Sequence, residues 1–273
     1  MRVLLTNDDG IEAEGLQALR RALRELPGVE LEVIAPDSNR SATARSITTR
    51  RPLTVREVRF ADGGAGYATD GTPVDCVRLA NLGLIDGFTP SLVVSGINHG
   101  ANLGDDVTYS GTVAAALEAV LLGLPGIAVS QQSPARELDF RAGEEFEFSA
   151  AAAFIARVVA RLETGALPRG TLLNVNVPGS EPDTVRVVRL GKRVYRDELT
   201  LIEDGPDGRR FEIYGEAAGT DGETDTDLAA IVDGHIAVTP LHFDLTDVGG
   251  MDALERADLS ALLEPAAREV AER

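Results

Sequence analysis

The amino-acid sequence predicts an α/β fold with a doubly wound, mostly parallel sheet core and a C-terminal arm of β-hairpins and a helix. Two observations predict the core: short, continuous apolar runs alternate with segments of helical periodicity, and polar loops follow several of these runs. Strands that helices bury on both faces have this appearance. A third observation predicts the arm, because turns rich in Gly and Asp become frequent after Pro178. A chain of 273 residues is long enough for both parts.

The elements of the core are expected to alternate between strand and helix along the chain. An apolar run at residues 3–6 predicts the first strand, and leucines at helical spacing predict a helix over residues 14–26. Thr72 followed by Pro73 is the pattern of an N-cap and a first helical position. Further strands are expected at residues 30–35, 52–60, 67–69, 91–97, 126–130 and 172–177, and further helices at residues 72–84, 112–122 and 145–162.

The segment after Pro178 is expected to be an appended region and not an independent domain. The sequence predicts an α/β catalytic core over residues 1–180 and an extended arm with a tail helix over residues 181–273. Extended arms of this kind often pack on a second subunit, so we expect an oligomer. Strand candidates in the arm lie at residues 186–190, 211–214 and 236–239, and an amphipathic tail lies at residues 254–270.

The composition argues against several classes of protein. Asp and Glu number 44 against 26 Lys and Arg, and the net charge of −18 disfavours a nucleic acid polymer as the ligand. There is neither an apolar run of the roughly 20 residues that span a membrane nor the pattern of a signal peptide, so we expect a cytoplasmic protein without a membrane partner. Cys76 has apolar neighbours at helical spacing and is expected to be a buried thiol. Residues 38–51 carry four arginines and no acid, which is either an attractive patch for a small phosphorylated anion or a solvated loop.

Two adjacent carboxylates, Asp8 and Asp9, follow the first expected strand and precede Gly10. Neighbouring side chains of a strand point to opposite faces, so both carboxylates converge only where the chain turns, which Gly10 permits. A divalent cation would relieve their repulsion. The alternative is that the pair caps the next helix, but a helix needs one cap and these residues lie several positions before it. We therefore favour a metal site over a cap.

Two other polar loops supply the oxygen atoms that hard cations prefer. Because ligands of doubly wound sheets bind at the carboxyl ends of the strands, these loops should meet the loop of Asp8 and Asp9. No His or Cys cluster has zinc spacing, which favours magnesium, manganese or calcium over zinc. His99 is either a proton donor or a structural loop histidine. The candidate neutral ligands are Ser38, Asn39, Ser41, Thr43, Asn98 and Asn102.

The sequence YSGT at residues 109–112 directly precedes an apolar helix. Free backbone N–H groups, a permissive glycine and two hydroxyls at a helix start can bind a phosphate, although an ordinary Ser/Thr cap gives the same pattern. The sequence lacks GxGxxG, the Walker lysine motif and DxDxT, which disfavours dinucleotide oxidoreduction, NTP-driven phosphotransfer and haloacid-dehalogenase-type chemistry. The residues alone therefore indicate metal-assisted chemistry on a small phosphate ester.

Five motifs in one order resemble those of the survival protein E (SurE) family of metal-dependent phosphatases. They are TNDDG, APDSNRSAT, GTPVDCVRLA, SGINHGANLG and YSGTVAAALEA, and they span most of residues 1–130. The resemblance resumes at DLAAIVDGHIAVTPL, with His235 as a departure from the tyrosine that the family has there. It implies a Rossmann-like core, an arm exchanged between the subunits of a homodimer or homotetramer, and hydrolysis of nucleoside 5′-monophosphates. Nucleoside 3′-monophosphates and short polyphosphate are implied as further substrates.

The same resemblance implies roles for individual residues. One divalent cation per subunit, Mg²⁺ or Mn²⁺, is expected. Its implied ligands are Asp8, Asp9, Ser41 and Asn98. The implied substrate and phosphate contacts are Asn7, Asn102, Ser110, Gly111 and Thr112, and the implied catalytic residues are Asp8, Asp9, Asn98 and Ser110.

The favoured hypothesis for catalysis is direct attack on phosphorus by a water that the cation activates and Asp8 orients or deprotonates. A covalent aspartyl phosphate on Asp8 is a less favoured variant. Two other function classes stay open. One is a non-catalytic module that binds a metal and a nucleotide, and the other is a glycosyltransferase-like enzyme that uses nucleotide sugars. The second is disfavoured because the Asp pair follows the first strand and not a complete nucleotide-binding core.

Overall fold

A computed structural model describes residues 1–136, 138, 145–162, 170–196, 198–206, 208–213, 216–220, 222–257 and 259–260. The chain divides into two compact units, Met1–Phe243 and Asp244–Arg273. Within the described ranges, no helix is both long enough and apolar enough to cross a membrane.

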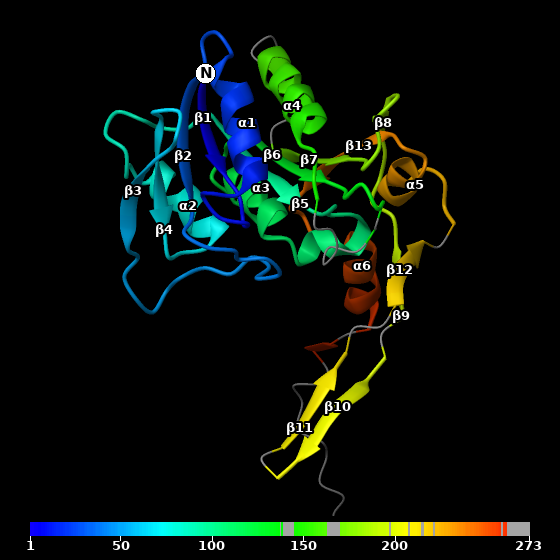
Figure 1. The fold of residues 1–273 in the computed structure, drawn as a ribbon. Helices are drawn as coiled ribbons and strands as arrows, with labels where there is room; N and C mark the ends of the chain where they lie inside the picture. The colour runs from blue at the N-terminus through cyan, green and yellow to red at the C-terminus, as the bar shows by residue number, and fades with distance from the viewer. Residues whose placement is uncertain are drawn as a thin grey trace, which may run out of the picture. The chain divides into compact units, whose positions relative to one another are not determined.

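The first unit is built on a nine-stranded sheet (Figure 1). Its strands are β1 (Arg2–Thr6), β2 (Glu30–Pro36), β3 (Val55–Arg59), β4 (Ala65–Thr69), β5 (Leu92–His99), β6 (Gly126–Gln131), β7 (Thr171–Val177), β8 (Val185–Val187) and β13 (Ile236–His242). They lie in the order β3-β4-β2-β1-β5-β6-β7-β13-β8. All neighbours are parallel except β3 with β4 and β13 with β7. The mostly parallel sheet confirms the predicted fold class.

Helices cover both faces of this sheet. One face carries α1 and α4, which pack against each other, and the opposite face carries α2 and α3 (Figure 1). This two-sided cover explains why β1 and β5 are almost entirely buried and read as continuous apolar runs. The four helices are α1 (Glu14–Arg24), α2 (Pro73–Asn81), α3 (Gly111–Leu121) and α4 (Ser149–Leu162).

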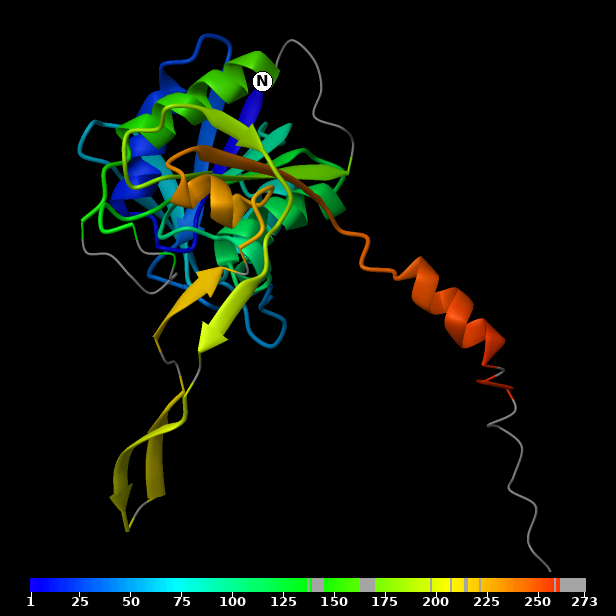
Figure 2. The same ribbon diagram turned by 90° about the vertical axis from the view of Figure 1, so that its right-hand side faces the viewer.

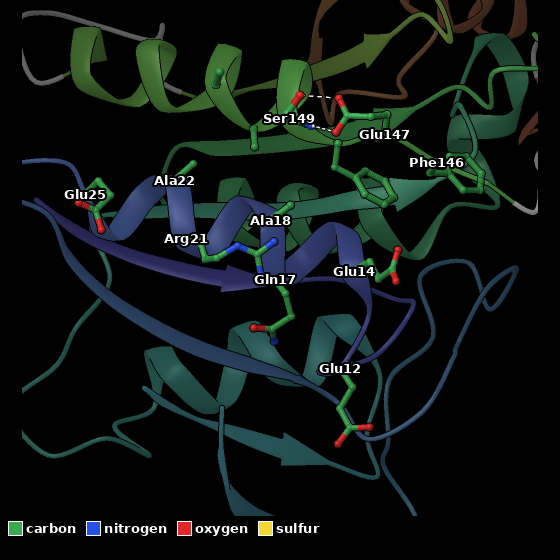
Figure 3. Close-up of a pocket in the computed structure, with 13 residues that line it drawn as sticks. Glu12, Glu14, Gln17, Ala18, Arg21, Ala22, Glu25, Phe146, Glu147 and Ser149 are labelled. Atoms are coloured by element: carbon green, nitrogen blue, oxygen red, sulfur yellow. Dashed lines mark hydrogen bonds between the residues drawn. The ribbon is translucent and has the colours of Figure 1, made fainter. Parts of the chain in front are cut away.

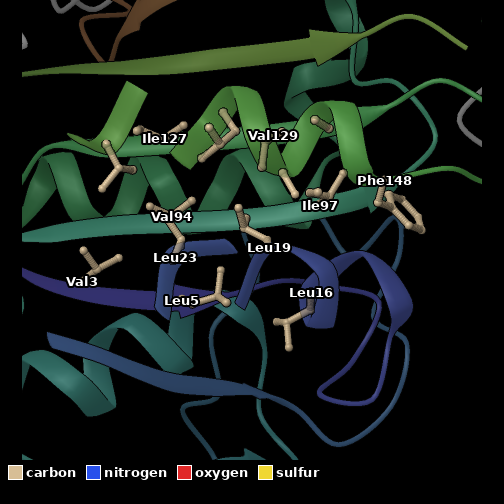
Figure 4. Close-up of a cluster of buried hydrophobic side chains, with 14 of the residues drawn as sticks. Val3, Leu5, Leu16, Leu19, Leu23, Val94, Ile97, Ile127, Val129 and Phe148 are labelled. Atoms are coloured by element: carbon tan, nitrogen blue, oxygen red, sulfur yellow. The ribbon is translucent and has the colours of Figure 1, made fainter. Parts of the chain in front are cut away.

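The largest apolar core lies between the sheet and the α1–α4 face (Figure 4). Leu16, Leu19 and Leu23 recur at helical spacing along α1 and are fully buried. They pack in the same cluster as Leu5 of β1 and Val94 of β5. The leucine spacing that predicted α1 is therefore the face that attaches this helix to the sheet.

The helix α2 begins as predicted. The Thr72 hydroxyl accepts a hydrogen bond from the Asp75 N–H, and the Asp75 carboxylate accepts one from the Thr72 N–H, so the two residues form a capping box. Pro73 occupies the first turn, and the helix ends at Asn81 instead of the expected residue 84. Cys76 on this helix is fully buried, as predicted, and burial raises the pKa of its thiol.

The helix α4 begins at Ser149, although the sequence predicted a start at residue 145. Phe146 and Phe148 precede it in a segment without regular secondary structure, and both stack on the ring of His99. Side chains two residues apart share a face in an extended chain but not in a helix. Packing both rings on one histidine therefore excludes these residues from the helix.

The region after Pro178 contains more regular structure than predicted. The expected strands at residues 186–190, 211–214 and 236–239 correspond to β8, β11 (Gly208–Glu212) and β13, with residue 214 outside the described residues. β13 inserts between β7 and β8 of the main sheet (Figure 2). The sequence analysis missed β9 (Arg193–Arg196), β10 (Thr200–Gly205), β12 (Glu216–Thr220) and α5 (Asp227–Val232). β10 pairs with β11, and β12 with β9, as antiparallel ribbons whose strands lack continuous apolar runs.

The second unit contains α6 (Val248–Arg256). The amphipathic tail expected at residues 254–270 overlaps the end of this helix. Residues 258 and 261–270 of that expected tail lie outside the described residues.

The order of strands changes direction at β1. The chain passes from β1 to β2 and β4 on one side and then crosses to β5 on the other. Open α/β sheets bind ligands in the crevice at the carboxyl ends of the strands where this reversal occurs. The loop of Asp8 and Asp9 leaves β1 at this crevice, and Asn98 lies at the end of β5.

Asp227 connects the arm to the loop that follows β5. It is fully buried at the start of α5, and burial raises its pKa. Its carboxylate accepts hydrogen bonds of 2.8, 2.8 and 2.9 Å from the N–H groups of Gly104, Gly191 and Leu228. Gly104 begins the short 3-10 helix η1 (Gly104–Thr108), which leads to α3. One buried carboxylate thus holds three segments that are far apart in sequence.

We expect Asp227→Ala to lower the free energy of unfolding by about 2–4 kcal/mol, because three buried N–H groups lose their acceptor. Urea denaturation at pH 7 measures this difference. Asp233→Ala is the matched control, because Asp233 is the exposed C-cap of the same helix and pairs with the exposed Arg186. Its expected effect is below about 0.5 kcal/mol. Equal losses in the two variants would contradict the anchoring role of Asp227.

Candidate functional site

The turn after β1 is stabilised by Asn7. Its Oδ1 accepts a hydrogen bond from the Gly10 N–H (3.2 Å), and its Nδ2 donates to the Gly10 carbonyl oxygen (2.9 Å). Gly10 has a φ of +110°, a conformation that favours glycine. The turn frees Asp8 and Asp9 from the alternation of an extended strand. Asn7 itself is fully buried, and its amide group is used within the turn.

The Asp8 carboxylate lies against the first turn of α3. It accepts hydrogen bonds from the Thr112 N–H (3.1 Å) and from the Thr112 hydroxyl (2.5 Å). The positive end of the helix dipole faces this carboxylate and stabilises its charge. A Cβ atom at Gly111 would lie 2.8 Å from the Asp8 carboxylate oxygen, so the approach requires glycine. Thr112, which was expected to contact phosphate, directs both of these groups to Asp8.

Asp9 contacts the two other loops of the site. Its carboxylate accepts hydrogen bonds from the His99 N–H (3.1 Å) and from Nδ2 of Asn39 (3.3 Å). The alternative that the Asp pair caps α1 is wrong, because the N-cap of α1 is Ala13 and no side chain caps this helix.

Burial dominates the electrostatics of the acidic pair. Burial, followed by the repulsion of Asp9, raises the pKa of Asp8 from 3.8 to about 6, even though the hydrogen bonds from Thr112 act in the opposite direction. Burial raises the pKa of Asp9 to about 6 as well. Within the described part of the chain, no basic side chain forms an ion pair with either carboxylate. Among the described residues, the pair therefore has no compensating positive charge in an ion pair.

The loop after β2 brings Ser41 to Asp8. The Arg40 N–H donates to the Asp8 carbonyl oxygen (2.6 Å), and the Ser41 N–H donates to Oδ1 of Asn39 (2.7 Å). Ser41 is exposed and lines the same small cavity as Asp8. Together with the bonds of Asp9, these contacts confirm that the three polar loops meet in space.

Acidic side chains neutralise three of the four arginines in this loop. Glu118, one of their partners, is fully buried on α3 and pairs with Arg78 of α2 as well. The arginine-rich stretch therefore fastens the loop to the core more than it offers a free positive surface. The pairs are Arg40–Asp37, Arg45–Glu118 and Arg51–Asp70, with N–O distances of 3.1, 3.0 and 2.7 Å.

Asn98 ends β5 just after an irregularity in the strand. The pairing register with β6 shifts between Ser95 and Asn98. The Asn98 Nδ2 donates to the Gly100 carbonyl oxygen (2.7 Å), and its Oδ1 lies 3.2 Å from the hydroxyl oxygen of Thr112. Asn98 and Asp8 thus share one threonine as a neighbour.

Two asparagines of β7 hold the backbone of Asn102. Asn176 accepts a hydrogen bond from the Asn102 N–H (2.8 Å), and Asn174 and Asn176 both donate to the Asn102 carbonyl oxygen (2.9 and 3.0 Å). The Asn102 side chain donates to the Ser130 hydroxyl (2.8 Å). The sequence analysis missed Asn174 and Asn176, although two asparagines on one face of a buried strand were a usable signal.

The three loops enclose a small cavity of about 30 Å³. Asp9 and Thr112 bond to residues that line it but do not line it themselves. The predicted site residues that line the cavity are Asp8, Ser41, Asn98, Asn102 and Ser110, and those that do not are Asn7, Asp9, Gly111 and Thr112. The other lining residues are Ala42, His99, Asp106 and Tyr109, of which the sequence analysis weighed an individual role only for His99.

Asp106 connects the cavity to the arm. It lies in η1, and its carboxylate forms a buried ion pair with Arg193 of β9. Breaking such a pair leaves a charge uncompensated in the interior, so both residues depend on each other. Sequence reasoning could not find this pair, because its members lie in regions that show no common motif.

A larger cavity, of about 740 Å³, lies between α1 and α4 (Figure 3). Phe146 and Phe148 form part of its wall, and His99 stacks on them with ring centroids 5.1 and 4.9 Å away. Nε2 of His99 accepts from the Gly15 N–H (3.4 Å), and burial lowers the pKa of this histidine. The described contacts of His99 are therefore those of a packed, neutral side chain between the two cavities.

The donor set beside the small cavity fits a hard divalent cation. Its charged members are the buried Asp8 carboxylate and the half-buried Asp9 carboxylate, and its neutral members are oxygens of Ser41 and Asn98. Among the residues that the structure describes, no group of three or more His, Cys, Asp or Glu side chains is arranged to hold a metal ion. A set made only of oxygen atoms, completed by water, suits Mg²⁺ or Mn²⁺ better than zinc.

A family model described as "Survival protein SurE" matches residues 3–197. The chain belongs to the SurE family. The SurE match extends from β1 into β9 and includes every loop around the small cavity.

Individual SurE proteins resemble the chain over almost its whole length. A protein of Rubrobacter xylanophilus named "5'-nucleotidase SurE" is 52% identical, with 96% of this chain and 99% of the relative covered. A protein of Desulforudis audaxviator with the same name is 47% identical, with 94% and 97% covered. The solved structure of the SurE protein from Aquifex aeolicus matches with a TM-score of 0.79 at 37% identity, covering 94% of this chain and 99% of that one.

We expect Asp8→Asn to stabilise the metal-free protein at pH 7.5 by about 1–3 kcal/mol. Because the pKa of Asp8 is about 6 in the folded state against 3.8 without burial, the unfolded state binds fewer protons between about pH 4 and 6. The free energy of unfolding therefore falls as the pH rises through this window, and the variant avoids this loss. Its amide oxygen can accept from the Thr112 N–H while its amide nitrogen donates to the Thr112 hydroxyl.

Urea denaturation in the presence of a chelator, at pH 4 and pH 7.5, tests this expectation. Asp105→Asn is the control, since Asp105 is exposed in η1 and its substitution should change stability by less than about 0.5 kcal/mol at either pH. An Asp8→Asn difference that is the same at both pH values would show that Asp8 does not titrate as described.

Proposed function

We propose that this chain is a metal-dependent 5′-nucleotidase, which hydrolyses nucleoside 5′-monophosphates to nucleoside and phosphate. The observation that carries the proposal is the pair Asp8 and Asp9, of which the buried Asp8 is held at the N-terminus of α3 beside a small polar cavity where the sheet reverses its order. The names of the SurE relatives that are 52% and 47% identical support the substrate class.

A cation held by Asp8, Asp9, Ser41 and Asn98 would supply a polarised phosphoryl oxygen and a water of lowered pKa. We assign Asp8 to orienting the attacking water or accepting its proton, because its carboxylate lines the cavity and Thr112 fixes its position. Asp9 is assigned mainly to holding the cation. For the hydrolysis itself we favour direct attack of water on phosphorus over a covalent intermediate on Asp8.

Ser110 is assigned to the phosphoryl group. Its hydroxyl accepts a hydrogen bond from the Val113 N–H (3.1 Å), which leaves its own proton free to donate to a phosphoryl oxygen. Ser110 can therefore cap α3 and bind a phosphoryl oxygen at the same time, so the two interpretations of the YSGT segment are compatible. Thr112, by contrast, is assigned to positioning Asp8, and Asn102 to the wall of the cavity. Negative charge that develops in the transition state would face the N-terminus of α3.

We propose that nucleoside 3′-monophosphates and short polyphosphate are further substrates. A cavity of about 30 Å³ is far smaller than the pockets of roughly 300–1,000 Å³ that enclose whole ligands, so it holds the phosphoryl end and leaves the rest of the ester outside. A site that grips one phosphoryl group tolerates variation in what is attached to it.

We further propose that the chain forms a homodimer or homotetramer through its arm. The β10–β11 ribbon exposes a row of large apolar side chains, which is unfavourable for an isolated surface. The exposed residues are Leu199, Leu201, Ile202, Phe211 and Ile213.

Phosphate release from a panel of nucleoside 5′- and 3′-monophosphates, with chelator-treated protein and added Mg²⁺ or Mn²⁺, tests the proposed activity. We expect release that depends on the metal and is lost in Asp8→Ala, because this change removes a cation ligand without removing apolar packing. Asp105→Ala, an exposed change near the same loop, is the control. Binding of nucleotide and metal without any release, from folded protein, would instead favour a non-catalytic binding module.

Ser41→Ala should have a milder effect, raising the metal concentration for half-maximal activity about three- to tenfold while the rate at saturating metal stays within about twofold. Water can replace one neutral ligand, whereas it cannot replace a carboxylate charge. A Mn²⁺ titration followed both by activity and by calorimetry measures the change. An unaltered metal affinity in the variant would remove Ser41 from the ligand set.

A further inference from the structure

We propose that the ring of Tyr109 stacks on the base of the nucleotide and makes the enzyme prefer purine nucleotides. This inference rests on the proposed function and adds a residue that determines substrate selectivity. Tyr109 lines the small cavity together with Asp8 and Ser110, and 56% of its surface is exposed.

The backbone of Tyr109 is held firmly on each side. Its N–H donates to the Asp106 carbonyl oxygen (2.9 Å), and its carbonyl oxygen accepts from the Ala44 N–H (3.1 Å). The next residue is Ser110, the N-cap of α3. Consecutive Cα atoms lie about 3.8 Å apart, so the Tyr109 side chain leaves the backbone next to the residue that is assigned to the phosphoryl group, and both residues line the same cavity.

The ring itself is free to receive a ligand. Within the described part of the chain, the Tyr109 hydroxyl makes no hydrogen bond and no aromatic side chain stacks on the ring. His99 is the other ring at this cavity, but Phe146 and Phe148 already stack on it, and the His99 side chain is partly buried. Of the two rings that line the cavity, only that of Tyr109 combines exposure with an unused face.

The small size of the cavity gives this ring its role. Because the cavity holds only the phosphoryl end, the nucleoside must lie over the rim, and Tyr109 is the large apolar surface of that rim. Stacking between a base and an aromatic side chain is favourable for every base, and stronger stacking gives preference without specific hydrogen bonds. Purines have the larger ring system, so they gain more from the contact.

The kinetic consequence follows from where the base is during the reaction. The bond that breaks joins phosphorus to the sugar oxygen, so the base is stacked equally in the ground state and in the transition state. Such a contact lowers KM with little effect on kcat. A purely structural role of Tyr109 would instead change the reaction of all phosphate esters alike.

The test compares kcat/KM for AMP, CMP and ribose 5-phosphate, the last of which has the sugar and the phosphate but no base. We expect Tyr109→Ala to reduce the ratio of AMP to ribose 5-phosphate about five- to tenfold through KM, and to reduce the ratio of AMP to CMP in the same direction. Tyr109→Phe, which keeps the ring, should retain both ratios. Leu82→Ala, at an exposed position after the C-terminus of α2, serves as the control for an unrelated apolar deletion.

Unchanged ratios in a folded Tyr109→Ala variant that hydrolyses AMP would overturn the stacking role and leave the proposed nucleotidase activity intact. A loss in the same proportion for all three substrates would also overturn it. If the unaltered protein releases phosphate from none of them with either metal, the proposed function fails and the stacking role fails with it. Circular dichroism and thermal unfolding establish that each variant is folded.

Discussion

The contact between the Asp8 carboxylate and the first turn of α3 is the constraint on which the rest of the site depends. It requires β1 to end beside β5, a glycine at position 111 and a threonine at position 112 whose N–H and hydroxyl both face the carboxylate. Because α3 packs on the sheet through its own apolar face, the helix cannot move without disturbing the core. The position of the Asp8 carboxylate is thereby tied to the packing of the whole α/β layer.

A buried polar framework extends this constraint to the surrounding loops. Asn174 and Asn176 hold the loop after β5, Asp227 holds the start of η1, and Glu118 holds the loop after β2. Each of these groups is buried, and each meets partners from segments distant in the sequence. A buried polar group without a partner is costly, so the loops have one favourable arrangement. The framework gives loops the positional precision that strands and helices have elsewhere.

The acidic pair is at the same time a source of instability. Burial raises the pKa values of Asp8 and Asp9, so that holding both carboxylates ionised at neutral pH costs free energy in the absence of a cation. The apolar core that α1 and α4 build on the other face of the sheet stabilises the fold against this cost. Functional sites commonly lower the stability of a protein in this way, and the regular packing of the rest of the fold offsets the loss.

The sequence by itself determined the fold class, the order of elements in the core, the capping of α2 and the family, because apolar periodicity, cap residues and motifs are local signals. It also pointed to Asp8, Asp9 and the loops that meet them. Only the tertiary structure decided that Thr112 serves Asp8, that the loop arginines are neutralised, and that Asn174, Asp106 and Tyr109 belong to the site. β9, β10, β12 and the true start of α4 were missed as well. For Thr112, Asn174, Asp106 and the start of α4 the deciding partner lies far away in the chain, and a local pattern carries no information about a partner that only folding brings near.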